Sequence, residues 1–300
     1  EFRRVLFRSL PHLVADIGEP SALLLIRRFL QHADAEARFD DRPKPPRDLE
    51  RVLQSEEEVG RLRIGATLTI GTDNTSPAAL SGSITGTGGL IKTGVGILTL
   101  SSASNSFGTA SVTGVELQQG GINFANATAL GVGNLLISGT NTSLTASAGT
   151  VFAQPVTFGN AATTITLGTS ASSNTLALSA GITWNTGSGL TRTIIVDSGS
   201  AQTLSGTITS SGTGNQLIKQ GTGTLAITGG NAGSDLFRGA QAVQIRGGTL
   251  SINADAALGL APASVVSNNI VIDGGTLSAS ASFTLNGSTV VPTGSIVFTS

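Results

Sequence analysis

The stretch GGLIKTGVGILTLS, residues 88–101, returns as NQLIKQGTGTLAIT at residues 215–228, with Leu, Ile, Lys, two Gly and Leu at matching positions. The similarity continues on both sides. LSGSITGTG from Leu80 matches LSGTITSSGTG from Leu204, and GINFANATALG from Gly121 matches GGTLSINADAALG from Gly247. Self-similarity at a fixed spacing is typical of repeat architectures. Residues 64–300 therefore contain two units of about 125 residues each.

Each unit consists of short runs in which apolar and polar residues alternate, such as TLTI, ATTITL, TLAI and NIVI. Alternation at period two with β-branched side chains predicts half-buried strands, and the Gly and Asn between them favour turns. Strands this short need neighbours on both sides, which stacked coils provide. We therefore predict a β-solenoid. A β-sandwich is the alternative fold, but sandwich cores use more aromatic residues.

The solenoid interior is expected to be aliphatic, with scattered aromatic plugs. The predicted plugs are Phe107, Phe124, Phe152, Phe158, Phe283 and Phe298. Trp184 and Phe237 are the aromatic residues to test for exposed sugar stacking, although a buried role is favoured for both.

The repeated motifs resemble the autotransporter-associated β-strand repeat of bacterial passenger domains. Leu90, Lys92, Gly94, Gly96 and Leu98 carry the central motif, which returns at Leu217, Lys219, Gly221, Gly223, Thr224 and Leu225. The later glycine-glycine-threonine-leucine motif stands at residues 247–250 and 274–277. The first copy departs from the pattern at Ile97, where threonine is usual, and at Gly121-Ile122.

This resemblance implies a right-handed parallel β-helix that is exported, after a signal sequence, across the bacterial outer membrane by a C-terminal β-barrel. Related repeats also occur in large secreted proteins that end in a short sorting anchor, which is the alternative export route. It implies a location at the cell surface or in the medium, and a part in adhesion or virulence. The expected partners are a host or environmental glycan or protein surface and the translocator barrel. Cut coils expose strand edges, so we also expect self-association through the solenoid ends.

Residues 1–63 differ from the rest of the chain. They hold 12 of the 17 Lys and Arg, 12 of the 18 Asp and Glu and both His, but no Thr or Asn. Residues 1–9, EFRRVLFRS, resemble a cloning adapter. Helices are predicted over 20–39 and 48–63, separated by the proline-rich stretch DDRPKPPRD. We expect this charged segment to be helical or disordered, to pack poorly, and to be foreign to the solenoid.

The composition argues against several kinds of chemistry. The net charge of −1 gives no basic field for nucleic acid, and the absence of Cys removes thiolate metal sites and disulfides. The solenoid region contains no His, so a serine triad has no base there, and its acids are well spread. We expect no catalytic residues, no cofactor and no metal.

The remaining enzymatic alternative is a β-helix lyase or hydrolase acting on polysaccharide. Asp197 with Arg192, or Asp235 with Arg238 and Arg246, would supply a carboxylate and cations. Lys92 and Lys219 occupy matching positions and are expected on the outer faces of strands as solubilising charges. The threonine-x-threonine pairs at residues 67–69 and 164–166 suggest ice binding, but they do not recur coil by coil. A non-enzymatic structural and interaction module, an adhesin or stalk, is the preferred function.

Overall fold

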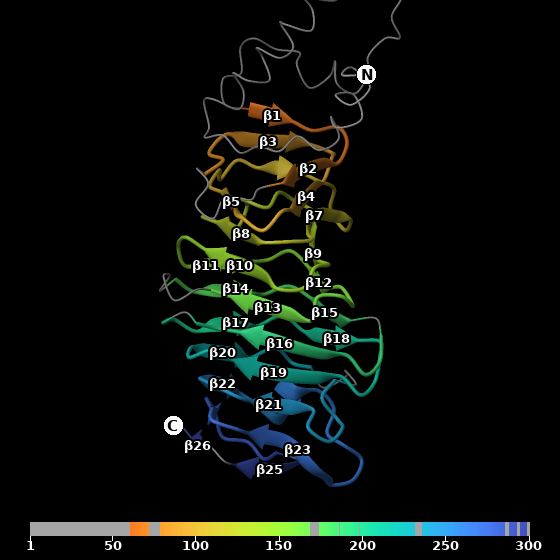
Figure 1. The fold of residues 1–300 in the computed structure, drawn as a ribbon, viewed down its shortest axis with the longest axis vertical. Coiled ribbons are helices and arrows are strands. Elements are labelled where there is room, and N and C mark those ends of the chain that lie inside the picture. Colours follow the sequence, from red (N-terminus) through yellow and green to blue (C-terminus); the bar gives the residue numbers. More distant parts are fainter. Residues whose placement is uncertain are drawn as a thin grey trace, which may run out of the picture.

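The computed structural model describes residues 61–71, 79–168, 174–185, 187–197, 199–231, 236–285, 288–292 and 295–298. Within these ranges the chain winds into a β-solenoid of short strands with one 3₁₀ turn, η1 (Asp255–Leu258) (Figure 1). Each strand pairs in parallel with the equivalent strand of the next coil. The predicted all-β solenoid is thus confirmed, since a sandwich is built from antiparallel sheets.

Four parallel sheets run along the solenoid, here named A to D. Sheet A contains β2 (Leu68–Gly71), β4 (Leu90–Thr93), β7 (Thr113–Leu117), β9 (Asn134–Ile137), β12 (Val156–Phe158), β15 (Ile182–Asn185) and β18 (Ile208–Ser210). Sheet B contains β1 (Arg61–Arg63), β3 (Ser83–Gly86) and β6 (Ser106–Phe107).

Sheets C and D extend further toward the C-terminal end. Sheet C contains β5 (Ile97–Leu100), β8 (Gly121–Phe124), β10 (Thr142–Ala146), β13 (Thr164–Leu167), β16 (Thr191–Ile195), β19 (Gln216–Gln220), β21 (Val243–Ile245), β23 (Val266–Ile272) and β25 (Ser288–Pro292). Sheet D contains β11 (Thr150–Phe152), β14 (Leu176–Leu178), β17 (Gln202–Leu204), β20 (Thr224–Ile227), β22 (Thr249–Ile252), β24 (Thr276–Ala279) and β26 (Ser295–Phe298).

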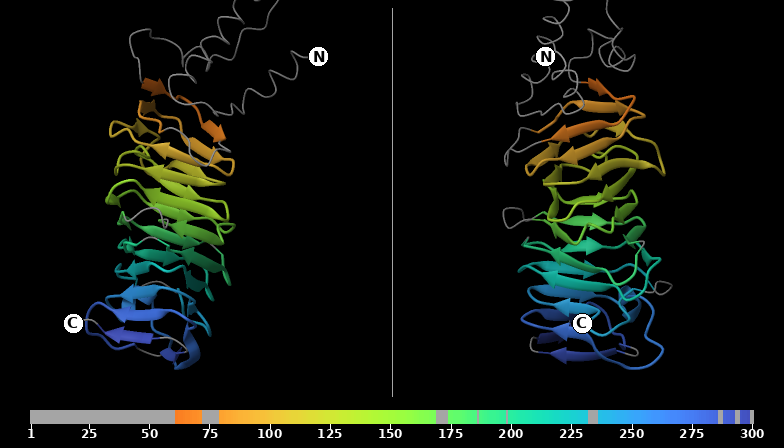
Figure 2. Two further views of the ribbon diagram at one scale, coloured as in Figure 1. Left: turned by 60° about the vertical axis from the view of Figure 1, so that its left-hand side comes forward. Right: turned by 45° about the vertical axis from the view of Figure 1, so that its right-hand side comes forward.

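The coils stack along one axis into a rod (Figure 2), and sheets A, C and D form its three sides over most of its length. From β9 to β20 the strands enter sheets A, C and D in strict rotation. Nearer the N-terminus, β6 of sheet B takes the place in the coil that sheet D takes later, between β5 of sheet C and β7 of sheet A.

The sequence repeat and the coil have different periods. In sheet A, the ladder that starts at Leu90 of β4 passes in five steps through Val115, Leu135, Val156, Ile182 and Ile208. Leu217, the counterpart of Leu90, comes after Ile208 in β19 of sheet C. One unit therefore spans five coils and one further side, so equivalent residues of the two units lie on neighbouring sides of the rod.

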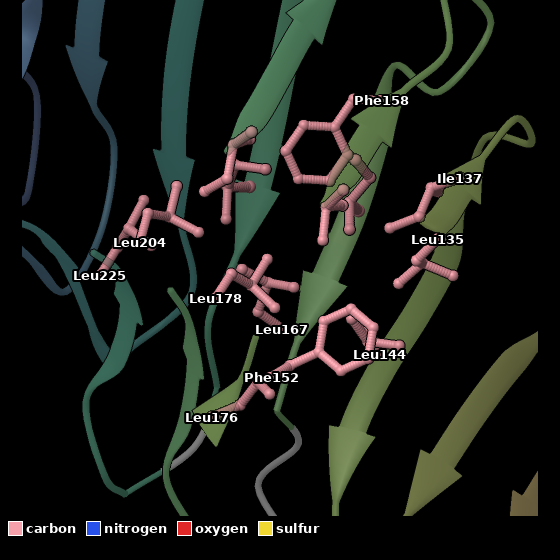
Figure 3. Packing of buried hydrophobic residues seen from close by; sticks show 14 of the residues in the cluster. Leu135, Ile137, Leu144, Phe152, Phe158, Leu167, Leu176, Leu178, Leu204 and Leu225 are labelled. Atoms are coloured by element: carbon pink, nitrogen blue, oxygen red, sulfur yellow. The ribbon is translucent and has the colours of Figure 1, made fainter. Parts of the chain in front are cut away.

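The interior is a continuous aliphatic column with aromatic plugs. Figure 3 shows the rings of Phe152 and Phe158 among leucine and isoleucine side chains from neighbouring coils. Phe124 and Phe152 pack with their ring centroids 5.9 Å apart. Phe107, Phe124, Phe152 and Phe158 are buried as predicted, and Phe283 is half-buried against the core. Because burial is shared by every coil, the hydrophobic effect stabilises the whole length of the rod.

The described structure begins inside the segment predicted as a second helix. Arg61, Leu62 and Arg63 form β1, which pairs in register with β3. The helix predicted over 48–63 therefore does not include these residues, because a strand here finds a neighbour for its backbone groups. The helix predicted over 20–39, together with the adapter-like residues 1–9, lies outside the described residues.

Candidate functional site

The two repeated lysines lie at buried corners of the solenoid. Lys92 Nζ donates to the carbonyl oxygens of Thr93, Gly94 and Gln119 at 2.5, 2.7 and 3.2 Å. Lys219 Nζ donates to those of Gln220, Gly221 and Gly247 at 2.6, 3.0 and 3.1 Å. In each set the third carbonyl belongs to the next coil. We call each arrangement a lysine cage.

The lysine cages correct the prediction that these lysines lie on outer faces. Both side chains are 0% exposed. In β4, Leu90 and Lys92 are buried while Ile91 and Thr93 are half-exposed, so the lysine has the inward parity of the leucine. The interior accepts the charge because backbone carbonyls surround the ammonium group in place of water.

Glycine makes the corner compact enough for the lysine cages. Gly94 and Gly221 take positive φ values of 74° and 80°, a region that favours glycine. In the next coil, a Cβ on Gly248 would stand 2.3 Å from the carbonyl oxygen of Gly223. Gly120 meets Gly96 in the same way. The glycines of the motif therefore allow consecutive corners to stack in contact.

The carboxylate of Asp197 acts electrostatically on the ammonium group of Lys219. Burial lowers the pKa of Lys219 to about 8, and the negative charge of Asp197 acts in the opposite direction. Asp197 Oδ1 accepts a hydrogen bond of 3.3 Å from the backbone N–H of Thr222, which lies in the corresponding turn of the next coil. The ammonium donors already bind three carbonyls, so this arrangement anchors a corner and leaves no open position for a substrate.

Arg192 is an interior residue. Its guanidinium donates to the carbonyls of Ala162 and Gly159, and to that of Trp184 at 2.7 Å. The guanidinium carbon lies 5.2 Å from the Phe158 ring centroid and 5.4 Å from that of Trp184. Burial lowers its pKa to about 10. Since Arg192 is 2% exposed, it is not presented to a polysaccharide beside Asp197.

Trp184 and Phe237 are buried plugs, which was the favoured interpretation. Trp184 is 0% exposed and Phe237 2% exposed. Their rings pack edge to face with centroids 5.3 Å apart, and Trp184 meets Phe158 in the same geometry at 5.7 Å. Both rings therefore fill the interior beside Arg192, where a sugar cannot stack on them.

Two buried asparagines form a second repeated device that sequence reasoning missed. Asn105 accepts from the Ile84 N–H at 2.8 Å and donates to the Ala129 carbonyl at 2.7 Å. Asn231 accepts from the Ile208 N–H at 2.5 Å and donates to the Ala257 carbonyl at 2.7 Å. Each amide bridges the coil before and the coil after its own. Asn105 and Asn231 stand at similar positions in the two units, which is the only sign of this role in the sequence.

One shallow groove opens on the surface near the C-terminal end. It has a volume of about 350 Å³ and is bounded by the turns that precede β19, β21 and β23, with Thr213, Arg238, Pro262 and Ser264 in its walls. Arg246, named with Arg238 in the polysaccharide alternative, donates to Gln244 Oε1 at 2.7 Å. Asp235, the carboxylate of that set, lies outside the described residues.

The described residues offer no cluster of three or more His, Cys, Asp and Glu side chains close enough to share a metal ion. His12 and His32 lie outside them. No helix in the described part of the chain has the length and apolarity needed to cross a bilayer.

Comparisons with protein-family models, with curated proteins and with solved structures find no match to this chain.

Proposed function

We propose that this chain is a non-enzymatic structural and interaction module of an exported bacterial surface protein, serving as a stiff spacer or display surface of the passenger type. Its coils stack along a single axis with a continuous core, which suits a spacer (Figure 2). Half-exposed Thr, Ser and Asn side chains on the outer faces offer many weak hydrogen bonds, which suits multivalent contact with a glycan or protein surface.

The lysine cages are the observation that carries this proposal. Both copies of the lysine motif perform the same task, binding backbone carbonyls of two consecutive coils. Arg192 likewise binds interior carbonyls. Lys92, Lys219 and Arg192 therefore serve the fold, and this favours a structural role over an enzymatic one.

Cell-surface display can be tested with antibodies against residues 64–300. We expect the antibodies to label intact cells of the source bacterium, and external protease to remove the label while a cytoplasmic marker survives. Deletion of an outer-membrane barrel encoded in the same frame should abolish the label. Labelling only after lysis would refute the proposed location.

The alternative function is a polysaccharide lyase or hydrolase, and the groove beside Arg238 is the observation that favours it. The test is to incubate the purified chain with neutral and acidic polysaccharides, and to measure new reducing ends and unsaturated products. We expect no turnover. Product formation that is lost in Arg238→Ala would replace the structural proposal with the enzymatic one.

A further inference from the structure

On β11 the outward side chain of sheet D is the apolar Val151, which is 57% exposed. From β14 to β24 the outer face of sheet D is built from small, uncharged side chains, and we call this part the hydroxyl face. Its members among the described residues are Ala177, Ser179, Thr203, Ser205, Thr224, Ala226, Thr228, Thr249, Ser251, Asn253, Thr276, Ser278 and Ser280. All of these side chains are half-exposed or exposed, and they alternate with buried Leu, Ile and Ala along each strand.

The hydroxyl face repeats in two directions. Thr224, Thr249 and Thr276 are register partners in successive coils. Ala226, Ser251 and Ser278 form a parallel column two residues further along the same strands. Neighbouring strands are about 4.8 Å apart, and two residues along a strand span roughly 6.6 Å. The side chains therefore form an array of hydroxyl and methyl groups that repeats in two directions.

The array is stiff before any partner arrives. Threonine has restricted χ1 rotation, and each strand is held on both sides by its ladder. The hydroxyl of Ser179 donates to the Phe152 carbonyl at 3.2 Å, and that of Ser280 to the Ile252 carbonyl at 3.3 Å. Binding to this face therefore demands little loss of side-chain entropy.

The chemistry of the hydroxyl face restricts the kinds of partner that it can bind. The residues that form it include no charge to attract a polyanion and no aromatic ring on which a sugar could stack, and the groove described above is lined by other residues. Contacts with single hydroxyl groups are weak, so appreciable binding needs many of them at once. A flat, uncharged, periodic solid that offers hydrogen bonds at regular intervals meets this requirement, and ice is such a solid.

We propose that the hydroxyl face binds ice. The threonine-x-threonine pair does not recur on sheet D, but β20, β22 and β24 repeat the pattern Thr-x-Ala/Ser, which brings Thr224, Thr249 and Thr276 into one column. The outer columns of the other sheets are mixed: sheet A places Ile91, Glu116 and Leu136 in one column. This binding is independent of export, so its failure would leave the proposed function standing.

The first unit supplies a matched control. Ser251 lies on β22, and its counterpart in the repeat is Asn123 on β8, which faces outward from sheet C. Ser251→Lys places a long, charged side chain in the middle of the hydroxyl face. Asn123→Lys makes the same kind of change on a different side of the rod.

The experiment measures inhibition of ice recrystallisation and partition into growing ice by the full chain. We expect the unmodified chain to be active, Ser251→Lys to lose at least about tenfold in activity, and Asn123→Lys to stay within about twofold. Circular dichroism and the emission of Trp184 establish that both variants are folded. Absence of activity in the unmodified chain, equal activity of Ser251→Lys, or adsorption to microcrystalline cellulose in place of ice would each overturn the proposal.

Discussion

The Nζ of Lys219 donates to the carbonyl oxygen of Gly247, 3.1 Å away and one coil further along the rod. Lys92 makes the equivalent bond to Gln119 at 3.2 Å. Parallel ladders join the strands of neighbouring coils, and single backbone hydrogen bonds such as that from the Gln119 N–H to the Lys92 carbonyl continue the contact into the corners. Lys92 and Lys219 add a charged hydrogen bond between the corners of two consecutive coils.

Lys219→Met should lower the free energy of unfolding by about 2–3 kcal/mol, because three buried carbonyl oxygens lose a charged donor. Urea unfolding followed by the emission of Trp184, the single tryptophan, measures the change. Arg63→Met, at an exposed position of β1, is the control and should stay within about 0.5 kcal/mol. A variant at Lys219 as stable as the parent chain would show that the cage contributes nothing.

The stability of the folded chain should rise with pH above about 8 through Lys219. Its folded pKa is about 8 against an ordinary value of 10.5. Between these values the unfolded chain holds a proton that the folded chain has released, so raising the pH favours the folded state; below pH 8 both states are protonated and the dependence vanishes. Unfolding measured from pH 7 to 10 in the parent and in Lys219→Met isolates this contribution as their difference.

Asp197→Asn provides a second check on the same group. The carboxylate of Asp197 raises the pKa of Lys219, so its removal should move the onset of the pH-dependent gain to lower pH. An unchanged onset would mean that the two side chains are not coupled electrostatically.

Asn231→Ala should destabilise the chain by about 1–3 kcal/mol, since the Ile208 N–H and the Ala257 carbonyl are left without their amide partner. Asn253→Ala, at a half-exposed position, is the matched control and should have a small effect. Thermal unfolding by circular dichroism compares the two variants. Equal losses would contradict a special role for the buried amide.

Gly248→Ala should destabilise the chain by at least about 1–2 kcal/mol from the left-handed backbone alone, with a further penalty from the clash with Gly223. Gly230→Ala is the control, because a Cβ there would meet nothing within 4 Å. Denaturation midpoints of both variants test this. If the two substitutions are tolerated alike, the corners of consecutive coils are not in close contact.

The solenoid and its plugs could be predicted because their cause is local. Alternation in runs such as TLAI sets which side chains turn inward. The large apolar ring of phenylalanine favours burial at those inward positions. The burial of Lys92 was missed because its charge was given more weight than its parity with Leu90. Alternation alone places both residues on the same side, and Leu217 and Lys219 repeat the relation.

The asparagine bridges and the rotation between units could not be predicted from the sequence. Asn231 contacts Ile208 and Ala257, and these separations become meaningful only once the coil register is known. Coil length varies, from 20 residues between Val115 and Leu135 to 29 between Ile165 and Ile194. A repeat of about 125 residues therefore does not reveal how many coils it contains.

Each sequence unit spans five coils and one further side, and this affects how many partners the rod can bind at once. A partner that recognised the outer surface around β5 would find the corresponding surface of the second unit, around β20, facing a different direction. Two bulky partners could then occupy equivalent positions without colliding. If one side of the rod lay against another surface, either the region around β5 or that around β20 would still be accessible. An integral number of coils per unit would instead have aligned every equivalent position in a single row.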